Sequence, residues 1–180
     1  MAFWTSTASE PKRQHRFLIY MDLGNSGFVP YLAMAMTKPG FEISETEHKF
    51  LGNTYYYPGS VTWNEVTCTI INSINPDGQS LLLQALADSG YLFPPGQFDG
   101  DAGTINKAQS QRALGAVQIA ELDGEGNEIS TWTLQNAFIK SAAFGDLDYD
   151  GDELLSIEIG MRYDWAEYSD NVNGQVFGGY

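Results

Sequence analysis

The chain has 180 residues, of which 43% are hydrophobic and 13% aromatic, a composition that supplies the core of one domain and excludes a disordered chain. Its formal net charge is -14, and residues 121–180 hold thirteen acidic and two basic side chains, so a conventional nucleic-acid-binding surface is disfavoured. The single cysteine excludes an internal disulfide, and no apolar run approaches the ~18 residues of a membrane span, so we expect cytoplasmic synthesis.

Strand patterns dominate the chain between a polar N-terminal arm, residues 1–15, and a Gly-rich tail, residues 169–180. Short stretches rich in aromatic and β-branched residues are separated by Gly, Pro, Asn and Asp, which is typical of a mainly β domain. The tail from Asn173 onward is expected to be a flexible end. The predicted strands cover residues 16–22, 28–37, 41–49, 61–72, 112–121, 128–140 and 153–165.

The first predicted hairpin joins strands 28–37 and 41–49. The connection Lys38-Pro39-Gly40 favours a tight turn, because proline presets φ and glycine accepts a left-handed corner. The segment that follows, residues 51–60, is predicted to be an exposed loop.

One helix is predicted between residues 75 and 90. Asn75 is a suitable cap and Pro76 a suitable first residue, and Gly90 is expected to end the helix. Residues 91–108 are predicted to be a loop, because they contain two adjacent prolines and scattered glycines. The helix is expected to bury an apolar stripe made of Leu82, Ala85 and Leu86.

The second predicted hairpin joins strands 112–121 and 128–140 through the glycine-containing turn 123–127. A period of two in strand 128–140 predicts that one face is buried and the other polar. The buried face holds Trp132, Leu134 and Phe138, and the polar face holds Thr131, Thr133 and Gln135. Strand 153–165 shows the same period. Its predicted apolar face holds Leu155, Ile157, Ile159, Met161, Tyr163 and Trp165.

The residues Asp146 to Gly151 reproduce the first half of a helix-loop-helix calcium loop. The twelfth position, which needs a bidentate Glu, holds Ile157 instead, and the flanks read as strands. We therefore predict a solvated turn, with a calcium-binding β-domain built on Asp146, Asp148 and Asp150 as the alternative.

No catalytic, cofactor or metal site is predicted. His15 and His48 lack the spacing of metal ligands, and Cys68 shares a strand face with Val66 and Ile70, as a small buried hydrophobic residue does. The chain has neither a Gly-rich phosphate loop nor a nucleophile elbow. We therefore do not expect an enzyme.

A β domain made of hairpins leaves backbone donors and acceptors unpaired at its sheet edges. Copies that pair edge to edge in a closed ring satisfy these groups, because a closed ring has no edges left. An acidic soluble β-domain without self-assembly remains the plain alternative.

In their order along the chain, the motifs resemble the tail tube proteins of contractile-tailed bacteriophages, from about Arg16 to Tyr168. The resemblance rests on the strand Arg16 to Met21, on Pro39-Gly40-Phe41-Glu42-Ile43, and on a Trp-bearing strand, Val61 to Ile70, before the helix. It continues through Trp132 to Ile139, Phe144-Gly145, Leu147-Asp148-Tyr149, Glu153 to Glu158 and Tyr163-Asp164-Trp165.

The resemblance implies a single tail-tube domain, an antiparallel β-sandwich or barrel with one α-helix, in which two hairpins join a ring-wide β-barrel. It implies stacked hexameric rings around a DNA channel, with the helix outside. The implied partners are further copies of the chain, a tail sheath protein, and baseplate and terminator proteins, and the implied location is the virion. The inner tube of a non-phage contractile injection system and a tube-like baseplate protein are the alternatives.

Two sets of site residues follow from this interpretation. Three consecutive tyrosines, Tyr55, Tyr56 and Tyr57, are expected at a contact between subunits or rings, because exposed tyrosine is favoured in interfaces. Polar side chains opposite the core are expected to line the channel and to offer DNA phosphate no cation. These predicted channel residues are Thr131, Thr133, Gln135, Gln118, Glu42 and Ser44.

Overall fold

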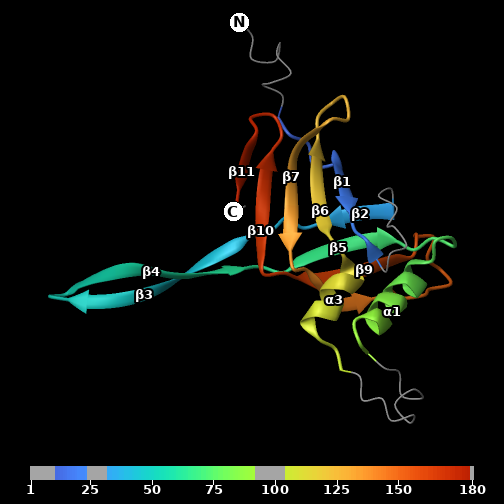
Figure 1. Cartoon of the computed structure of the whole chain (residues 1–180), viewed down its shortest axis with the longest axis horizontal. Coiled ribbons are helices and arrows are strands. Elements are labelled where there is room, and N and C mark those ends of the chain that lie inside the picture. Colours follow the sequence, from blue (N-terminus) through green and yellow to red (C-terminus); the bar gives the residue numbers. More distant parts are fainter. Residues whose placement is uncertain (1–10, 24–31, 92–103, 179–180) are drawn as a thin grey trace, which may run out of the picture.

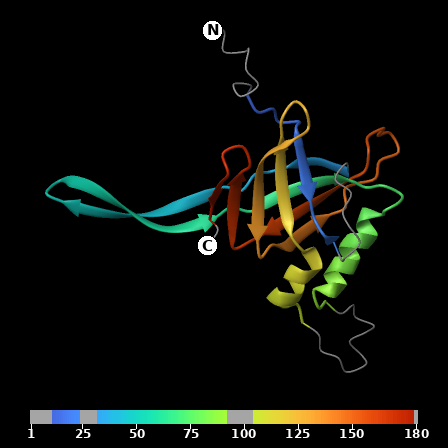
Figure 2. The same cartoon turned by 45° about the horizontal axis from the view of Figure 1, so that its top comes forward.

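The computed structural model describes residues 11–23, 32–91 and 104–178, which form two antiparallel sheets, two helices and one projecting two-stranded arm. The strands of the two sheets cross one another, and the helices lie together at one end of the crossing (Figure 1). The layers and the arm are seen again in the turned view (Figure 2). The mainly β antiparallel fold predicted from the sequence is confirmed.

Sheet A has five strands, and each is antiparallel to its neighbours. Its order is β1 (Phe17–Tyr20), β6 (Val117–Leu122), β7 (Glu128–Gln135), β10 (Trp165–Asp170) and β11 (Gln175–Phe177). The predicted hairpin of the chain's second half is confirmed as β6 and β7. Its turn is held by the Asp123 carboxylate, which accepts hydrogen bonds from the backbone N–H groups of Glu125 and Asn127.

Sheet B has four strands in the order β2 (Ala33–Met36), β5 (Val66–Ile71), β9 (Ser156–Arg162) and β8 (Phe138–Ala143). The inner face of its centre pairs Ile70 with Ile157 and Cys68 with Ile159, and all four side chains are buried. The predicted burial of Cys68 is therefore confirmed. Burial raises the pKa of its thiol to about 12, which keeps the thiol protonated and unreactive at neutral pH.

Two helices follow β5 in the described part of the chain, where the sequence predicted one. Helix α1 (Gly78–Asp88) begins at Asp77, whose carboxylate accepts from two backbone N–H groups, and not at Asn75. Helix α3 (Lys107–Leu114) lies where a loop and the start of a strand were predicted. Asn106 caps α3 and Gly115, at φ 68°, ends it, so β6 begins only at Val117.

The long hairpin β3 (Phe41–Phe50) and β4 (Asn53–Trp63) forms an arm that projects from the body (Figure 1). Two corrections follow. Strand β3 pairs with β4 and not with β2, and residues 51–60 are mostly strand and not loop. The chain reverses at Leu51 and Gly52, which both have positive φ and form a two-residue turn. The sequence did not indicate this turn, because leucine is uncommon at positive φ.

Two predicted strands each divide between the sheets. Segment 128–140 passes from β7 in sheet A to β8 in sheet B through Asn136, which has φ 57°. Segment 153–165 passes from β9 to β10 at Tyr163 and Asp164. Beyond this point Trp165 pairs with Gln135 and is 38% exposed, so it does not share the predicted apolar face. Lys107 of α3 contacts both carboxylate oxygens of Asp164 at 2.6 and 2.7 Å, and the Asn136 amide donates to the same carboxylate at 2.8 Å. The Asp164 carboxylate therefore links α3 to both points at which the chain crosses from one sheet to the other.

The C-terminal tail is ordered further than predicted. The Asp170 carboxylate accepts from the backbone N–H groups of Val172 and Asn173, which forms a turn into β11. Phe177 of β11 stacks on Tyr168, with ring centroids 6.3 Å apart. Backbone pairing and this aromatic contact hold the tail on sheet A as far as Phe177.

Replacing Asn136 by alanine is expected to lower the free energy of unfolding by about 1–2 kcal/mol, because alanine is strained at positive φ and donates nothing to Asp164. Replacing Asn136 by glycine removes the same hydrogen bond without the strain, so the loss is expected to be smaller. Urea unfolding of the two variants measures the difference. Equal losses of stability in the two variants would contradict a role for the positive φ of Asn136.

Candidate functional site

The polar residues predicted on strand 128–140 share the outer face of sheet A. Thr133 pairs with Gln118 on one side and with Glu167 on the other, and Thr131 pairs with Ser169. Leu134 points inward and is buried, and Trp132 packs against the core. The alternation predicted from the sequence is therefore confirmed within β7, and it brings Thr131, Thr133, Gln135 and Gln118 to one surface. It does not extend to Phe138, because the chain changes sheet at Asn136. Phe138 pairs with Arg162, and Ile139 takes the inward position opposite the buried Met161.

The other two predicted channel residues lie elsewhere. Glu42 and Ser44 belong to the arm, which is a separate two-stranded sheet. The Ser44 hydroxyl accepts a hydrogen bond from the backbone N–H of Ser60 at 3.0 Å, at the irregularity between the arm strands. Within one copy the arm does not join the outer face of sheet A, so these residues share no surface with Thr133.

A second outer face, on sheet B, was missed by the sequence reasoning. Its central row pairs Thr67 with Gly160 and Gly160 with Ser141, and the next row pairs Thr69 with Glu158. These side chains are small or neutral apart from Glu158. The signal was present in the alternation of residues 66–71, but the sequence did not show which strand lay beside β5.

This face of sheet B has a helix behind it. The start of α1, at Gly78, lies against Ile70 and Ile157, which are on the inner face of the sheet. Leu82 and Ala85 of α1 also belong to the buried core. The helix and the outer face of sheet B are therefore on opposite sides of the same sheet.

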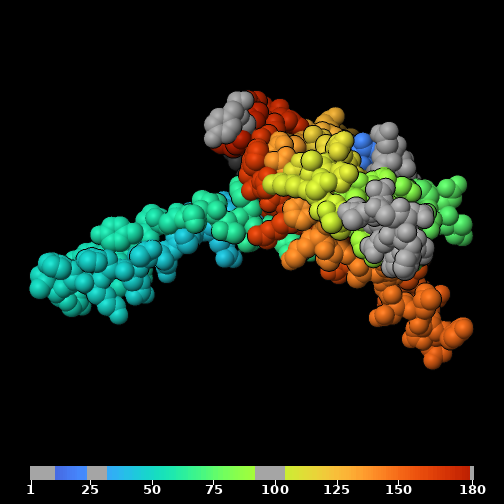
Figure 3. Space-filling view, turned by 60° about the horizontal axis from the view of Figure 1, so that its bottom comes forward, coloured from blue at the N-terminus to red at the C-terminus, as the bar shows by residue number. Residues whose placement is uncertain are grey.

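The arm is exposed on both faces. Because it is a strand pair and not a loop, its three tyrosines alternate: Tyr56 lies opposite Glu47, whereas Tyr55 and Tyr57 lie opposite His48 and Thr46 on the other face. Each of the three keeps about half of its surface exposed, and the space-filling view shows the arm standing free of the body (Figure 3). The described residues of the same copy leave the arm exposed, and an isolated two-stranded ribbon is only marginally stable in water.

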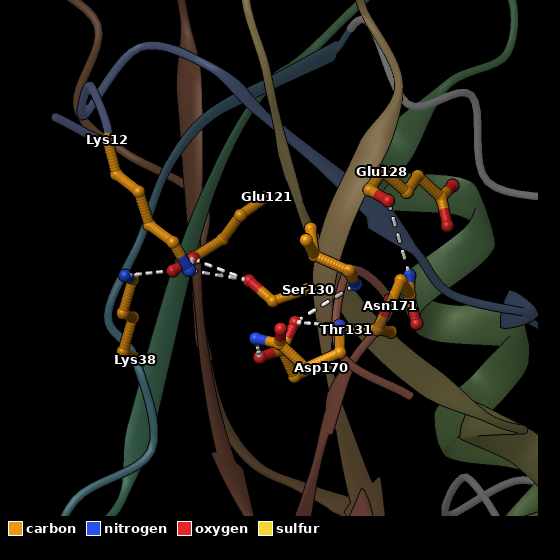
Figure 4. Close-up of polar contacts among 10 residues, drawn as sticks. Lys12, Lys38, Glu121, Glu128, Ser130, Thr131, Asp170 and Asn171 are labelled. Atoms are coloured by element: carbon orange, nitrogen blue, oxygen red, sulfur yellow. Dashed lines mark hydrogen bonds and ion pairs between the residues drawn. The ribbon is translucent and has the colours of Figure 1, made fainter. Parts of the chain in front are cut away.

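A buried carboxylate joins the N-terminal segment to the sheets (Figure 4). Glu121, whose side chain is 9% exposed, forms ion pairs with Lys12, at 2.6 Å, and with Lys38. Ser130 donates to the same carboxylate at 2.7 Å. Burial by itself would raise the pKa of Glu121, but these three partners outweigh it and lower that pKa to about 2.

The segment Asp146 to Asp152 is exposed and has no regular structure, as predicted for a solvated turn. The Asp148 carboxylate accepts from the backbone N–H of Asp150 at 3.1 Å. Across residues 11–23, 32–91 and 104–178 no three His, Cys, Asp or Glu side chains are grouped so that they could hold a metal ion. Within the same ranges neither helix has the length and hydropathy to cross a membrane.

The low pKa of Glu121 predicts a defined loss of stability in acid. A folded pKa below the unfolded value of about 4.5 gives stability that is complete above pH 5 and is lost as the pH falls toward 2. We expect a loss on the order of 2 kcal/mol, less than the full shift implies because both lysines are half exposed.

Urea unfolding at pH 6, 4 and 3 measures this dependence. Glu121→Gln is expected to flatten the pH dependence, whereas Glu125→Gln, on the exposed turn nearby, is expected to keep the wild-type slope. If the free energy of unfolding depends on pH in Glu121→Gln as it does in the wild type, protonation of Glu121 is not coupled to folding.

The architecture is similar to that of chains in solved structures of contractile injection systems. No family model matches the sequence, and no curated protein matches it. Among solved structures, however, similar folds cover about nine tenths of this chain. Because the sequence identities are 15% or lower, the similarity establishes the fold alone.

Three of the similar structures illustrate the shared fold. A chain in the extended sheath-tube complex of an extracellular contractile injection system, PVC, aligns with a TM-score of 0.64 and 14% identity, covering 91% of this chain and 95% of its own. A chain in the anti-feeding prophage baseplate aligns with a TM-score of 0.63 and 15% identity, covering 89% and 97%. Hcp1 from E. coli EAEC 042, in a mutant form, aligns with a TM-score of 0.51 and 10% identity, covering 90% and 96%.

Proposed function

We propose that this chain is the tail tube protein of a contractile-tailed bacteriophage, which stacks as hexameric rings into a conduit for DNA inside a sheath. The observation that carries the proposal is a tube-protein fold whose two-stranded arm has no partner within one copy. Such an arm is explained by assembly, because a partner copy supplies the cover that a single copy lacks. The proposed partners are further copies, a sheath protein, and baseplate and terminator proteins, and the proposed location is the virion tail.

The similar structures include chains from extracellular injection systems, so the inner tube of a non-phage system is the second candidate. The match to a baseplate structure equally favours a tube-like baseplate protein on which a tube begins. Genes for a capsid and a terminase beside the gene for this chain support the phage tail, and their absence supports the other candidates.

Electron microscopy of the purified protein tests the assembly. We expect rings with six-fold symmetry, and tubes at higher protein concentration, because edge strands and arm are satisfied only between copies. A protein that stays monomeric at every concentration, by light scattering as well as by microscopy, would overturn the proposal.

Two surfaces are candidates for the channel wall. The sequence-based assignment to Thr131, Thr133, Gln135 and Gln118 remains a prediction. It is supported by a polar outer face whose paired neighbours at Thr133 include an acid, Glu167, and no lysine or arginine. The outer face of sheet B competes with it. The resemblance implies a helix outside the channel, and α1 packs behind sheet B, on the side opposite Thr67 and Thr69.

We favour sheet B, because its free edges also fit ring closure. Strands β2 and β8 are the two edges of that sheet, so β8 of one copy is able to continue into β2 of the next. Among the described residues of β8 and β9, the basic groups on or near its outer face are Arg162 of β9 and Lys140 of β8. The Lys140 ammonium is paired with Glu65 at 2.6 Å, which reduces its attraction for phosphate.

Lysine substitutions distinguish the two walls. We expect Thr69→Lys to leave assembly intact and to slow DNA ejection several-fold at low salt, because each added cation contacts phosphate in every subunit of every ring. Raising the salt concentration is expected to restore the rate. Thr133→Lys is the matched variant on sheet A, and we expect it to leave the rate unchanged. The reverse result would assign the channel to the residues chosen from the sequence.

A further inference from the structure

A groove opens between the free edges of the two sheets, where β1 and β2 lie near one another (Figure 1). It has a volume of about 940 Å³. Its floor is apolar and includes Leu18, Met34 and Ile119. Met34 is 52% exposed, so part of this floor faces water in the single copy.

The rim of the groove is basic, in a chain whose net charge is -14. Four of the nine lysines and arginines of the chain line it, against a single acid, Glu121. The ammonium groups of Lys12 and Lys38 meet on that acid but stay half exposed, at 50% and 60% of their side chains (Figure 4). The four basic residues are Lys12, Arg13, Arg16 and Lys38.

The arm has the complementary chemistry. One of its faces carries Glu45 and Glu47 beside Tyr56, with Ile43 and Val61 nearer the base and Lys49 nearer the tip. Ile43, Tyr56 and Val61 are each more than half exposed. An apolar strip with two carboxylates beside it fits an apolar groove at whose rim the ammonium groups of Lys12 and Lys38 stay half exposed.

The arm does not serve the groove of its own chain, because it extends away from the body and carries its tip to the end of the molecule farthest from β1 (Figures 1 and 2). The occupant is therefore another copy. We propose that the face of the arm bearing Glu45, Glu47 and Tyr56 docks into the β1–β2 groove of a second copy of this chain. The inference rests on the proposed function, since it names the surface through which tube subunits meet.

The alternative occupant within a second copy is the loop at residues 144–155, which is also acidic and exposes Leu147 and Tyr149. The arm is favoured for two reasons. It offers a continuous apolar strip along a regular strand, whereas the loop has no regular structure. The arm also presents backbone groups that are able to pair with the free edge of β1.

Disulfide trapping tests the contact. Cysteine is placed singly at Tyr55, Tyr56 or Tyr57 in one set of copies and at Met34 in another set, and the two are mixed, assembled and oxidised. The native Cys68 is buried and stays in place. We expect covalent dimers of Tyr56→Cys with the Met34 variant, at a yield about tenfold above that of the controls and of Tyr55→Cys and Tyr57→Cys on the opposite face, because docking raises the local thiol concentration.

Two controls define the outcome. Leu83→Cys, at an exposed site on α1, replaces Met34→Cys as the control for the groove, and Leu147→Cys replaces the arm variants as the control for the loop. A charge on the groove floor, Met34→Glu, is expected to weaken self-association about tenfold through repulsion of the arm carboxylates, with Leu83→Glu near wild type.

The results separate this inference from the proposed function. Wild-type protein that assembles while Tyr56→Cys does not cross-link to Met34→Cys, or while Tyr55→Cys, Tyr57→Cys or Leu147→Cys cross-links in its place, overturns the docking and leaves the tube proposal intact. Wild-type protein that does not self-associate overturns both. Cross-linking of the arm together with weakened assembly of Met34→Glu supports both.

Discussion

The carboxylate of Asp164 is the interaction on which the arrangement of the two sheets depends. Two continuous segments, 128–143 and 156–170, each supply a strand to sheet A and a strand to sheet B. Their corners meet where Asp164 accepts from Lys107 and Asn136, and the backbone N–H of Asp164 donates to the carbonyl of Gln135 at 3.0 Å. Because both corners are fixed to one side chain, the crossing of the sheets and the position of α3 are set together.

The sequence predicted those parts of the fold that depend on local chemistry. The hairpin of β6 and β7 was found because Asp, Gly and Asn mark its turn, and the inward positions of Cys68 and Leu134 followed from alternation. The hairpin of the arm was not predicted, because Leu51 occupies a left-handed position where glycine or asparagine is usual. Strand partners more remote in the chain, such as β2 with β5, leave no local signal.

In the candidate site, too, local features were predictable from the sequence and features that depend on remote segments were not. Which side chains share a face was predictable, since a period of two decides it without knowledge of the fold. Which face meets a channel or a neighbour was not, because that depends on the layer that lies behind it, here α1 behind sheet B. The basic groove was equally hidden, since Lys12 and Lys38 converge on Glu121 from segments that are distant in the chain.

The arm also gives the molecule a direction. A contact in which a projection on one copy enters a recess on the next is heterologous, so it joins unlike surfaces and has no two-fold axis. Any open stack built through it ends with unfilled grooves on one side and free arms on the other. The two ends then differ in charge as well as shape, one basic and the other acidic. A factor that starts the stack and a factor that stops it therefore face different chemistry, and each is able to recognise its own end without measuring length.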